Sequence, residues 1–411
     1  MQLNLKGSNM KKALFIVLAF FVTTASAGEQ KTDKIKQLFD SVSKEVKAQY
    51  APDRRTKTYE PVLDISDDGK IIILRGSTTE AGAKEALLKA LVDNKIEVTD
   101  SMIVLPDPAL GNKIYGVTAL SVINFRYGPD YDEESATQTV LGTPLRVLEK
   151  RGGWTRAITP EGYIAWVTSG SIQTMNEDEF MTWSTSPRLI ITTYYTIFRD
   201  APSESAGVVM DGIMGNIVRA DGESGNYYKV ILPNGKSAFL LKSHAMDFEK
   251  WINTRQATPE NIIATARQFL GFPYMWAGTS VKAIDCSGLT KTTYYLNGII
   301  LERDASQQGY TGDSVSIANG IDSLKTGDLL FFGSKATPGK KERISHVAIY
   351  IGGGQFIHSA TSVRINSLLP DAMDYYEGSP RLVRSRRILT RIDKEEGIVS
   401  IKNHPWYFPK K

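Results

Sequence analysis

The sequence predicts a multidomain α+β protein, and three observations carry this prediction. One stretch repeats itself at an offset of 73 residues, a lone cysteine begins a helical pattern, and two histidines lie twelve residues apart on strand-like runs. The repeat predicts two copies of a small β domain, whereas the cysteine and histidines predict a helix packed on an antiparallel sheet. With 411 residues, of which 42% are hydrophobic, the chain is long enough for several cores.

Residues 1–27 have the pattern of a secretory signal. Three lysines precede an apolar run at 13–22, and Ala25-Ser26-Ala27 forms a small-residue cleavage site. A transmembrane anchor is the competing interpretation, but the run is shorter than the roughly 20 apolar residues that span a bilayer. No cysteine follows it that could carry a lipid. We therefore expect an exported protein, periplasmic or secreted, with no membrane anchor after cleavage.

The charge balance argues against nucleic acid as a partner. Removal of the signal would lower the formal net charge from +4 to about +1, because that segment holds three lysines and no acid. Nucleic-acid binders concentrate basic residues on one face, and the mature chain shows no such excess. A single cysteine also cannot form an internal disulfide in the oxidising space outside the cytoplasm.

Residues 28–112 predict a small α/β unit. A charged, helix-prone segment comes first, strand-like runs follow at 70–74 and 101–105, and an amphipathic helix is expected over 81–92. Ser77-Thr78-Thr79-Glu80 has the spacing of a capping box for that helix. These residues indicate packing or positioning rather than chemistry.

Two copies of one small domain are expected at 113–178 and 186–250. Eight identical pairs carry the offset: Arg126/Arg199, Pro129/Pro202, Gly142/Gly215, Arg146/Arg219, Ile158/Ile231, Pro160/Pro233, Gly162/Gly235 and Ala165/Ala238. Short strands, glycine-bearing turns and a length of about 60 residues suit a small barrel. The copies differ where Tyr163 aligns with Lys236, and only the first has the acidic run at 130–134.

Cys286 lies in Asp285-Cys286-Ser287-Gly288, before a helical pattern over 289–296 that Asn297-Gly298 ends. Unpaired N–H groups and the positive end of the dipole at a helix N-terminus lower the pKa of a thiol, so this position suits a nucleophile. The alternative is a buried, inert structural cysteine.

Residues 344–359 predict two strands joined by a glycine turn. His346 and His358 are each six residues from Gly352, so antiparallel pairing would place them nearly opposite, on one face. One imidazole can then take the thiol proton while the second orients it. The alternatives are histidines without a role or half of a metal site, although no second cluster with ligand spacing supports a metal. His244 and His404 stand alone and are expected at the surface.

Six blocks between about residues 258 and 391 resemble the NlpC-type cysteine peptidases, papain-like bacterial enzymes that cut peptidoglycan stem peptides. In chain order the blocks are Pro273-Tyr274-Met275-Trp276-Ala277-Gly278, Asp285-Cys286-Ser287-Gly288, Arg303-Asp304 with Gln307 or Gln308, Gly327-Asp328-Leu329-Leu330-Phe331-Phe332, Ser345-His346-Val347-Ala348-Ile349-Tyr350-Ile351 and Phe356-Ile357-His358-Ser359. The resemblance implies a papain-like domain at 258–391 that needs no cofactor or metal, followed by a tail at 392–411.

The resemblance also implies a role for each site residue. Cys286 would be the nucleophile, His346 the base and His358 the polar residue that holds the imidazole. Tyr274 and the backbone at Cys286 would help to hold the oxyanion. Asp285, Ser287 and Asp304 are the remaining substrate-binding candidates in this domain.

The two repeats resemble bacterial SH3-like domains, which accompany this peptidase in many cell-wall enzymes. In dipeptidyl-peptidase members the first such domain closes the far end of the cleft, and an acid and a tyrosine there help to bind the free amine of the substrate's L-Ala. Glu134 and Tyr163 are the candidates here, and Asp304 matches the catalytic-domain acid that binds the same amine. Many relatives have Ser after that Asp. This chain has Ala305, so one amine contact is expected to be missing or moved to Ser306.

The resemblance implies hydrolysis of the bond between γ-D-Glu and L-Lys or diaminopimelate in stem peptides with a free N-terminal L-Ala. Such a site would reject acylated or chain-linked termini, because they leave buried acids unpaired. Peptidoglycan stem peptides are thus the expected partner. Three alternatives remain: an endopeptidase acting on intact wall with the SH3-like domains as anchors, a non-catalytic wall-binding protein, and an acyltransferase or amidase on the same scaffold. For the acidic run itself, a solvated loop is the alternative.

Overall fold

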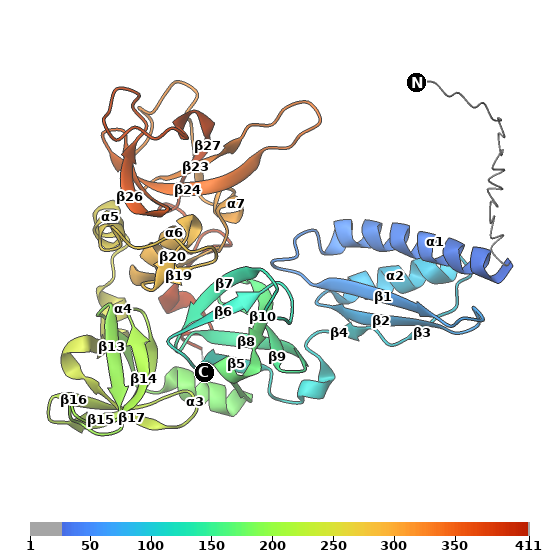
Figure 1. The fold of residues 1–411 in the computed structure, drawn as a ribbon, viewed down its shortest axis with the longest axis horizontal. Helices are drawn as coiled ribbons and strands as arrows, with labels where there is room; N and C mark the ends of the chain where they lie inside the picture. Colours follow the sequence, from blue (N-terminus) through green and yellow to red (C-terminus); the bar gives the residue numbers. More distant parts are fainter. Residues whose placement is uncertain (1–26, 410–411) are drawn as a thin grey trace, which may run out of the picture.

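The computed structural model describes residues 27–409 (Figure 1). The predicted signal lies outside these residues, except that Ala27 begins the first helix. In this part of the chain, no helix combines the length and the apolar character needed to cross a membrane. The first of two β units lies at the centre of the molecule, between an N-terminal unit, a second β unit and a C-terminal α+β unit.

The N-terminal unit packs two helices against a small mixed sheet. Its elements are α1 (Ala27–Tyr50), β1 (Tyr59–Ile65), β2 (Ile72–Thr78), α2 (Ala81–Asp93), β3 (Thr99–Asp100) and β4 (Ile103–Val104). Strand β1 pairs antiparallel with β2, and β3 and β4 pair parallel with it. Phe39, Leu74, Leu87 and Leu91 lie in the core between helices and sheet.

The predicted capping box is wrong. Ser77 and Thr78 belong to strand β2, so the helix begins with Glu80 as its N-cap and without a side-chain cap bond. The hydroxyl of Thr78 instead donates to the carbonyl of Thr58 and accepts from the amide of Glu80. Ser77 and Thr78 therefore belong to a paired strand and not to the helix start that the local pattern predicted.

The two β units have the same topology. The first contains β5 (Tyr115–Thr118), β6 (Val122–Arg126), β7 (Ser135–Val140), β8 (Pro144–Arg151), β9 (Trp154–Ile158), β10 (Ile164–Thr168) and β11 (Ile172–Met175). The second contains β12 (Arg188–Ile191), β13 (Tyr195–Arg199), β14 (Val208–Ile213), β15 (Ile217–Ser224), β16 (Tyr227–Ile231), β17 (Ser237–Leu241) and β18 (Ala245–Asp247). The strand orders β11-β5-β8-β9-β10-β6-β7 and β18-β12-β15-β16-β17-β13-β14 are equivalent. Strands β5 to β10 recur in the second unit as β12 to β17, with bounds shifted by 73 residues, as the repeat predicts.

The C-terminal unit packs a helix against a six-stranded antiparallel sheet. The sheet runs β22-β27-β23-β24-β25-β26. Its strands are β22 (Asp313–Val315), β23 (Leu329–Ser334), β24 (Arg343–Gly352), β25 (Gln355–Ala360), β26 (Ser362–Ser367) and β27 (Leu382–Arg387). The other elements are α5 (Pro259–Arg267), β19 (Thr279–Ser280), β20 (Ala283–Ile284), α6 (Cys286–Leu296), β21 (Ile299–Leu301), α7 (Ala305–Gln308) and β28 (Ile398–Ser400). The core between α6 and the sheet includes Leu289, Phe331, Val347 and Ile357.

Two short helices and the chain end connect the units. Helices α3 (Glu177–Thr185) and α4 (Phe248–Thr254) follow the two β units. The tail packs as a strap: Tyr407 is 2% exposed beside Phe248, and Arg188 donates to its carbonyl. His404 is buried as well, with Nε2 3.0 Å from the carbonyl of Pro160, so its predicted surface position is wrong.

Candidate active site

The predicted helix after Cys286 is confirmed, and its start is fixed by Asp285 and Gly288. Asp285 is the N-cap of α6, and its Oδ1 accepts from the amide of Gly288 at 2.7 Å. A Cβ at Gly288 would lie 1.9 Å from the carbonyl oxygen of Gly278, so only glycine fits. The loop at Gly278 therefore packs directly against the first turn of α6, which holds Cys286 in one place.

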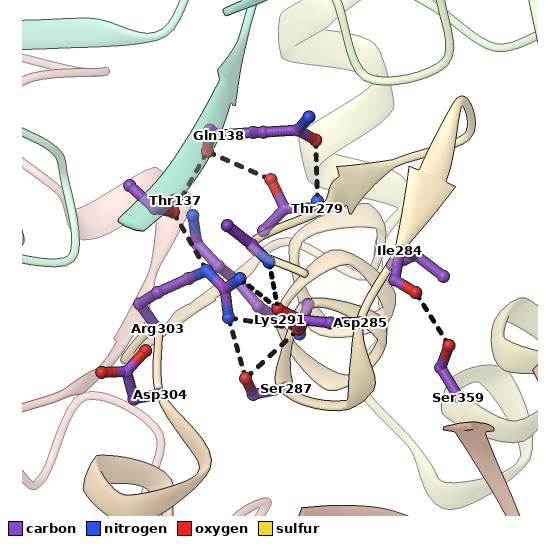
Figure 2. Close-up of polar contacts among 12 residues, drawn as sticks. Thr137, Gln138, Thr279, Ile284, Asp285, Ser287, Lys291, Arg303, Asp304 and Ser359 are labelled. Atoms are coloured by element: carbon purple, nitrogen blue, oxygen red, sulfur yellow. Dashed lines mark hydrogen bonds and ion pairs between the residues drawn. The ribbon is translucent and has the colours of Figure 1, made fainter. Parts of the chain in front are cut away.

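A buried arginine completes this support (Figure 2). Arg303, 2% exposed, donates to Asp285 Oδ2 at 2.6 Å and to Ser287 Oγ at 2.8 Å, and its Nε bonds Thr137 of strand β7 at 3.0 Å. Asp285 Oδ2 also accepts from Ala277, whose φ of 66° is unusual for a non-glycine residue. The side chains of Asp285 and Ser287, predicted to bind substrate, are thus engaged in holding the helix start against the first β unit.

The thiol of Cys286 is buried, with 8% of the residue exposed, and the backbone N–H of Val347 contacts its sulfur. Burial, followed by the negative charge of Asp285, raises the pKa of the thiol to about 12. The helix N-terminus was expected to lower the pKa of this thiol, and that expectation is wrong because burial outweighs the helix N-terminus. Because the thiol is neutral here, its proton has to leave as the sulfur attacks.

The two histidines meet, although in a different register from the predicted one. Tyr350 pairs with Phe356 and Gly352 with Gln355, so the turn lies one residue beyond Gly352. His346 and His358 are therefore diagonal neighbours on one face, two positions out of direct opposition. His346 Nε2 and His358 Nδ1 are 2.8 Å apart.

The hydrogen bonds beyond the pair fix which ring nitrogens carry protons. Asn366 Nδ2 donates to the carbonyl of Asp374 at 2.8 Å, which leaves Asn366 Oδ1 to accept from His358 Nε2 at 2.9 Å. His358 Nδ1 must then accept from His346 Nε2. His346 consequently keeps an unprotonated Nδ1, which is the nitrogen of a base.

Both rings are held in their neutral form. Burial, and next the neighbouring His358, lowers the pKa of His346 to about 3. Burial also lowers the pKa of His358 to about 4, opposed by its bond to Asn366. Tyr376 packs against both rings, with centroid separations of 6.2 Å from His346 and 5.0 Å from His358. No signal in the sequence pointed to Asn366 or Tyr376.

Tyr274 is half-buried beside the thiol. Burial raises the pKa of its hydroxyl, and the proximity of Cys286 and Asp285 adds to that effect. A neutral phenol can donate a hydrogen bond, as the predicted oxyanion role requires. That role stays a prediction.

A pocket of about 410 Å³ lies over Cys286, a volume in the range of small-ligand sites. The predicted Asp304 and Glu134 both line it, and Trp276, 58% exposed, lies at the same pocket without having been predicted. Tyr163 lies behind the lining: it is 1% exposed, and its hydroxyl is 3.4 Å from Asp304 Oδ2 and 2.9 Å from Tyr127 Oη. The first β unit thus contributes Tyr127, Glu134 and Ala136 to the lining of the pocket.

The N-terminal unit also reaches this pocket, although its sequence indicated only packing or positioning. Arg54 lines it, with its guanidinium 4.1 Å from the ring of Tyr127. Arg55 Nη1 donates to Asp304 Oδ2 at 3.0 Å and to Ser306 Oγ at 2.7 Å. Ser306, the expected substitute for a missing amine contact, is therefore already bonded to Arg55.

The arrangement can perform acyl transfer through a thiol. It combines a thiol at a capped helix start, a neutral imidazole with an unprotonated nitrogen, a second imidazole hydrogen-bonded to the first, and a pocket that the thiol lines. Among residues 27–409 no group of three or more His, Cys, Asp or Glu side chains is arranged to hold a metal ion.

Comparison with known proteins agrees with this arrangement. Residues 271–380 match the NlpC/P60 family, and residues 126–172 match the bacterial dipeptidyl-peptidase Sh3 domain. A gamma-D-glutamyl-L-lysine dipeptidyl-peptidase of Bacillus cereus is 33% identical over 242 residues, which is 57% of this chain and 70% of the relative. The chain belongs to the NlpC/P60 family.

Two further comparisons give the extent of the similarity. The gamma-D-glutamyl-L-lysine dipeptidyl-peptidase of Bacillus subtilis is 27% identical over 61% of this chain and 81% of its own length. The crystal structure of an NlpC/P60 family protein from Bacillus cereus superimposes with a TM-score of 0.56 and 28% identity, and covers 66% of this chain and 99% of that one. The match thus extends beyond the peptidase domain.

Proposed function

We propose that the protein is a cysteine peptidase that hydrolyses the bond between γ-D-Glu and L-Lys or diaminopimelate in peptidoglycan stem peptides with a free N-terminal L-Ala. The observation that carries the proposal is the pocket over Cys286, which Asp304 and Glu134 line, with the hydroxyl of Tyr163 behind Asp304. The two carboxylates favour a cationic group beside the thiol, such as the free amine of a short N-terminal unit. Two Bacillus relatives are named gamma-D-glutamyl-L-lysine dipeptidyl-peptidases, which supports this bond as the target.

In the proposed reaction, His346 Nδ1 takes the thiol proton as the sulfur of Cys286 attacks the γ-carbonyl of D-Glu. Tyr274 and the backbone amide at Cys286 stabilise the oxyanion. The imidazolium then protonates the leaving amine of L-Lys or diaminopimelate, and a thioester remains. Water attacks the thioester while His346 takes its proton, L-Ala-γ-D-Glu leaves, and the sulfur regains a proton.

The amine site sets the specificity in this proposal. Asp304 and Glu134 would contact the ammonium of L-Ala, because both line the pocket, and the buried Tyr163 would support Asp304 from behind through its hydroxyl. An N-acylated terminus brings no charge, so the carboxylates would lose their partner on binding. The enzyme would therefore trim released peptides outside the cytoplasm, in the periplasm or medium.

Product analysis tests the proposal. The mature protein is incubated with L-Ala-γ-D-Glu-L-Lys and, separately, with intact sacculi, and soluble products are identified by mass spectrometry. We expect L-Ala-γ-D-Glu and L-Lys from the tripeptide, no release from sacculi, and no reaction with Cys286→Ala. Release of peptides from sacculi would favour a wall endopeptidase, and transfer to an added amine instead of water would favour an acyltransferase.

A further inference from the structure

Arg55 links the N-terminal unit to the acid proposed for the amine site. It lies in the segment between α1 and β1, 249 residues before Asp304 in the chain, and its Nη1 is 3.0 Å from Asp304 Oδ2. The same nitrogen donates to Ser306 Oγ at 2.7 Å. A guanidinium thus stands beside the carboxylate that the proposed function assigns to the ammonium of the substrate.

The position of Arg55 does not depend on Asp304. Its Nε and Nη2 form a fork on the carboxylate of Asp53, with distances of 2.8 Å to Oδ1 and 2.6 Å to Oδ2. Its carbonyl accepts from the amide of Ile164 in strand β10 at 2.6 Å. The arginine is therefore anchored on one side to its own segment and to the first β unit, with Nη1 directed to Asp304.

The charged side chains of Asp53, Arg55 and Asp304 follow one another with alternating sign. Asp53 balances Arg55, so the Asp53–Arg55 pair adds no net charge to the amine site, where the acids Asp304 and Glu134 line the pocket together with Arg54. The side chain of Asp304 remains 26% exposed, which leaves part of the carboxylate accessible from the pocket. A substrate ammonium bound to Asp304 would continue this alternation as the next positive charge after Asp53, Arg55 and Asp304.

We propose that Arg55 is a positioning residue for Asp304, through which the N-terminal unit takes part in binding the substrate amine. This inference rests on the proposed function. The charge-assisted bond from Arg55 holds the Asp304 carboxylate in one orientation, whereas a freely rotating carboxylate would lose that alignment. The opposite interpretation makes Arg55 a competitor that the ammonium must displace, and it predicts the opposite sign in the experiment below.

Steady-state kinetics on L-Ala-γ-D-Glu-L-Lys and its N-acetyl form tests this role. For Arg55→Ala we expect KM for the free-amine peptide to rise about tenfold while kcat stays within about twofold. The reason is that the weakened contact between Asp304 and the ammonium affects substrate binding and not the chemical step. The kcat/KM of the N-acetyl peptide should not change. In an Asp304→Asn background, Arg55→Ala should have no further effect, because its effect acts through Asp304.

Two controls separate this role from general stability. Lys57→Ala removes a cation from the same segment that pairs with Glu80 instead, and should leave both constants unchanged. Arg55→Lys keeps the charge but not the fork, so it should give an intermediate KM even if the alanine variant folds poorly. Melting temperatures check the fold of each variant.

The outcomes are distinct. The role of Arg55 alone would be overturned if Arg55→Ala left KM unchanged or lowered it. It would also be overturned if kcat/KM fell equally for both peptides, or fell as much in the Asp304→Asn background as in the wild-type enzyme. Equal cleavage of both peptides by the wild-type enzyme would overturn the proposed amine site, and the role of Arg55 with it.

Discussion

Asn366 offers the sharpest test of how the histidine pair works, because it touches neither the pocket nor the thiol. Its amide is held by the carbonyl of Asp374, and its Oδ1 receives the Nε2 proton of His358. Asn366→Ala removes that acceptor. His358 is then free to carry its proton on Nδ1, which would force His346 to accept through Nε2 and to carry its own proton on Nδ1. An imidazole in that form cannot accept the proton of Cys286.

The magnitude follows from the burial of His358, which is 0% exposed. If the ring keeps the active tautomer, its Nε2–H is left buried and unpaired, at a cost of about 1–3 kcal/mol. If His358 changes tautomer, the active tautomer becomes the less populated one, and the free-energy difference between the two forms is of similar size. Since 1.4 kcal/mol corresponds to about tenfold in rate, we expect kcat to fall about 10- to 100-fold with KM near its original value.

The assay combines kinetics with nitrogen NMR of the histidine rings. The chain has four histidines, so single substitutions of His244 and His404 assign the remaining two. The wild-type spectrum should show an unprotonated Nδ1 on both His346 and His358, and Asn366→Ala should lose this pattern. Gln355→Ala is the matched control, because it loosens the same loop through Asp374 at 2.9 Å without touching the ring. An Asn366→Ala enzyme with full kcat and unchanged ring signals would refute the reasoning.

Further predictions concern pH and the C-terminal strap. Because burial lowers the pKa of His346 to about 3, the acid limb of kcat/KM should lie below pH 5, and a limb near pH 6.5 would contradict the buried neutral base. The pKa values of His346 and His358 are lowered in the folded protein, so the unfolded chain binds more protons in acid. The free energy of unfolding should therefore fall as pH drops below about 6.5. His358→Gln should weaken this pH dependence in thermal melts. Tyr407→Ala should destabilise the protein by about 3–5 kcal/mol, measured by denaturant unfolding, because the ring is buried beside Phe248; a loss under 1 kcal/mol would indicate a loosely held strap.

Patterns that depend on neighbouring residues were readable from the sequence. The helix after Cys286 follows from its apolar spacing and its Asn-Gly end, and the 73-residue repeat gives six pairs of strands with the same offset. Alternation along strands put both histidines on one face even though the turn was misplaced, since a shift by two positions keeps the face. The capping box failed because strand pairing of Ser77 and Thr78 overrides a local motif.

Features set by tertiary contact could not be predicted in this way. The high pKa of Cys286 comes from burial under the sheet, which outweighs the helix N-terminus that the sequence displays. Asn366 acts through a bond that depends on the position of Asp374, and Arg55 reaches Asp304 only because the N-terminal unit packs beside the first β unit. Neither residue has a local pattern that distinguishes it from an ordinary polar surface residue. The roles of the site residues and the domain limits remain predictions.

The specificity of the amine site is the central claim, and one ratio tests it most directly. The kcat/KM of the wild-type enzyme is measured for L-Ala-γ-D-Glu-L-Lys with a free and with an acetylated N-terminus. We expect a preference of at least about 100-fold for the free amine, because acetylation removes the substrate cation that Asp304 and Glu134 would bind from the pocket side. Equal values for the two peptides would contradict it.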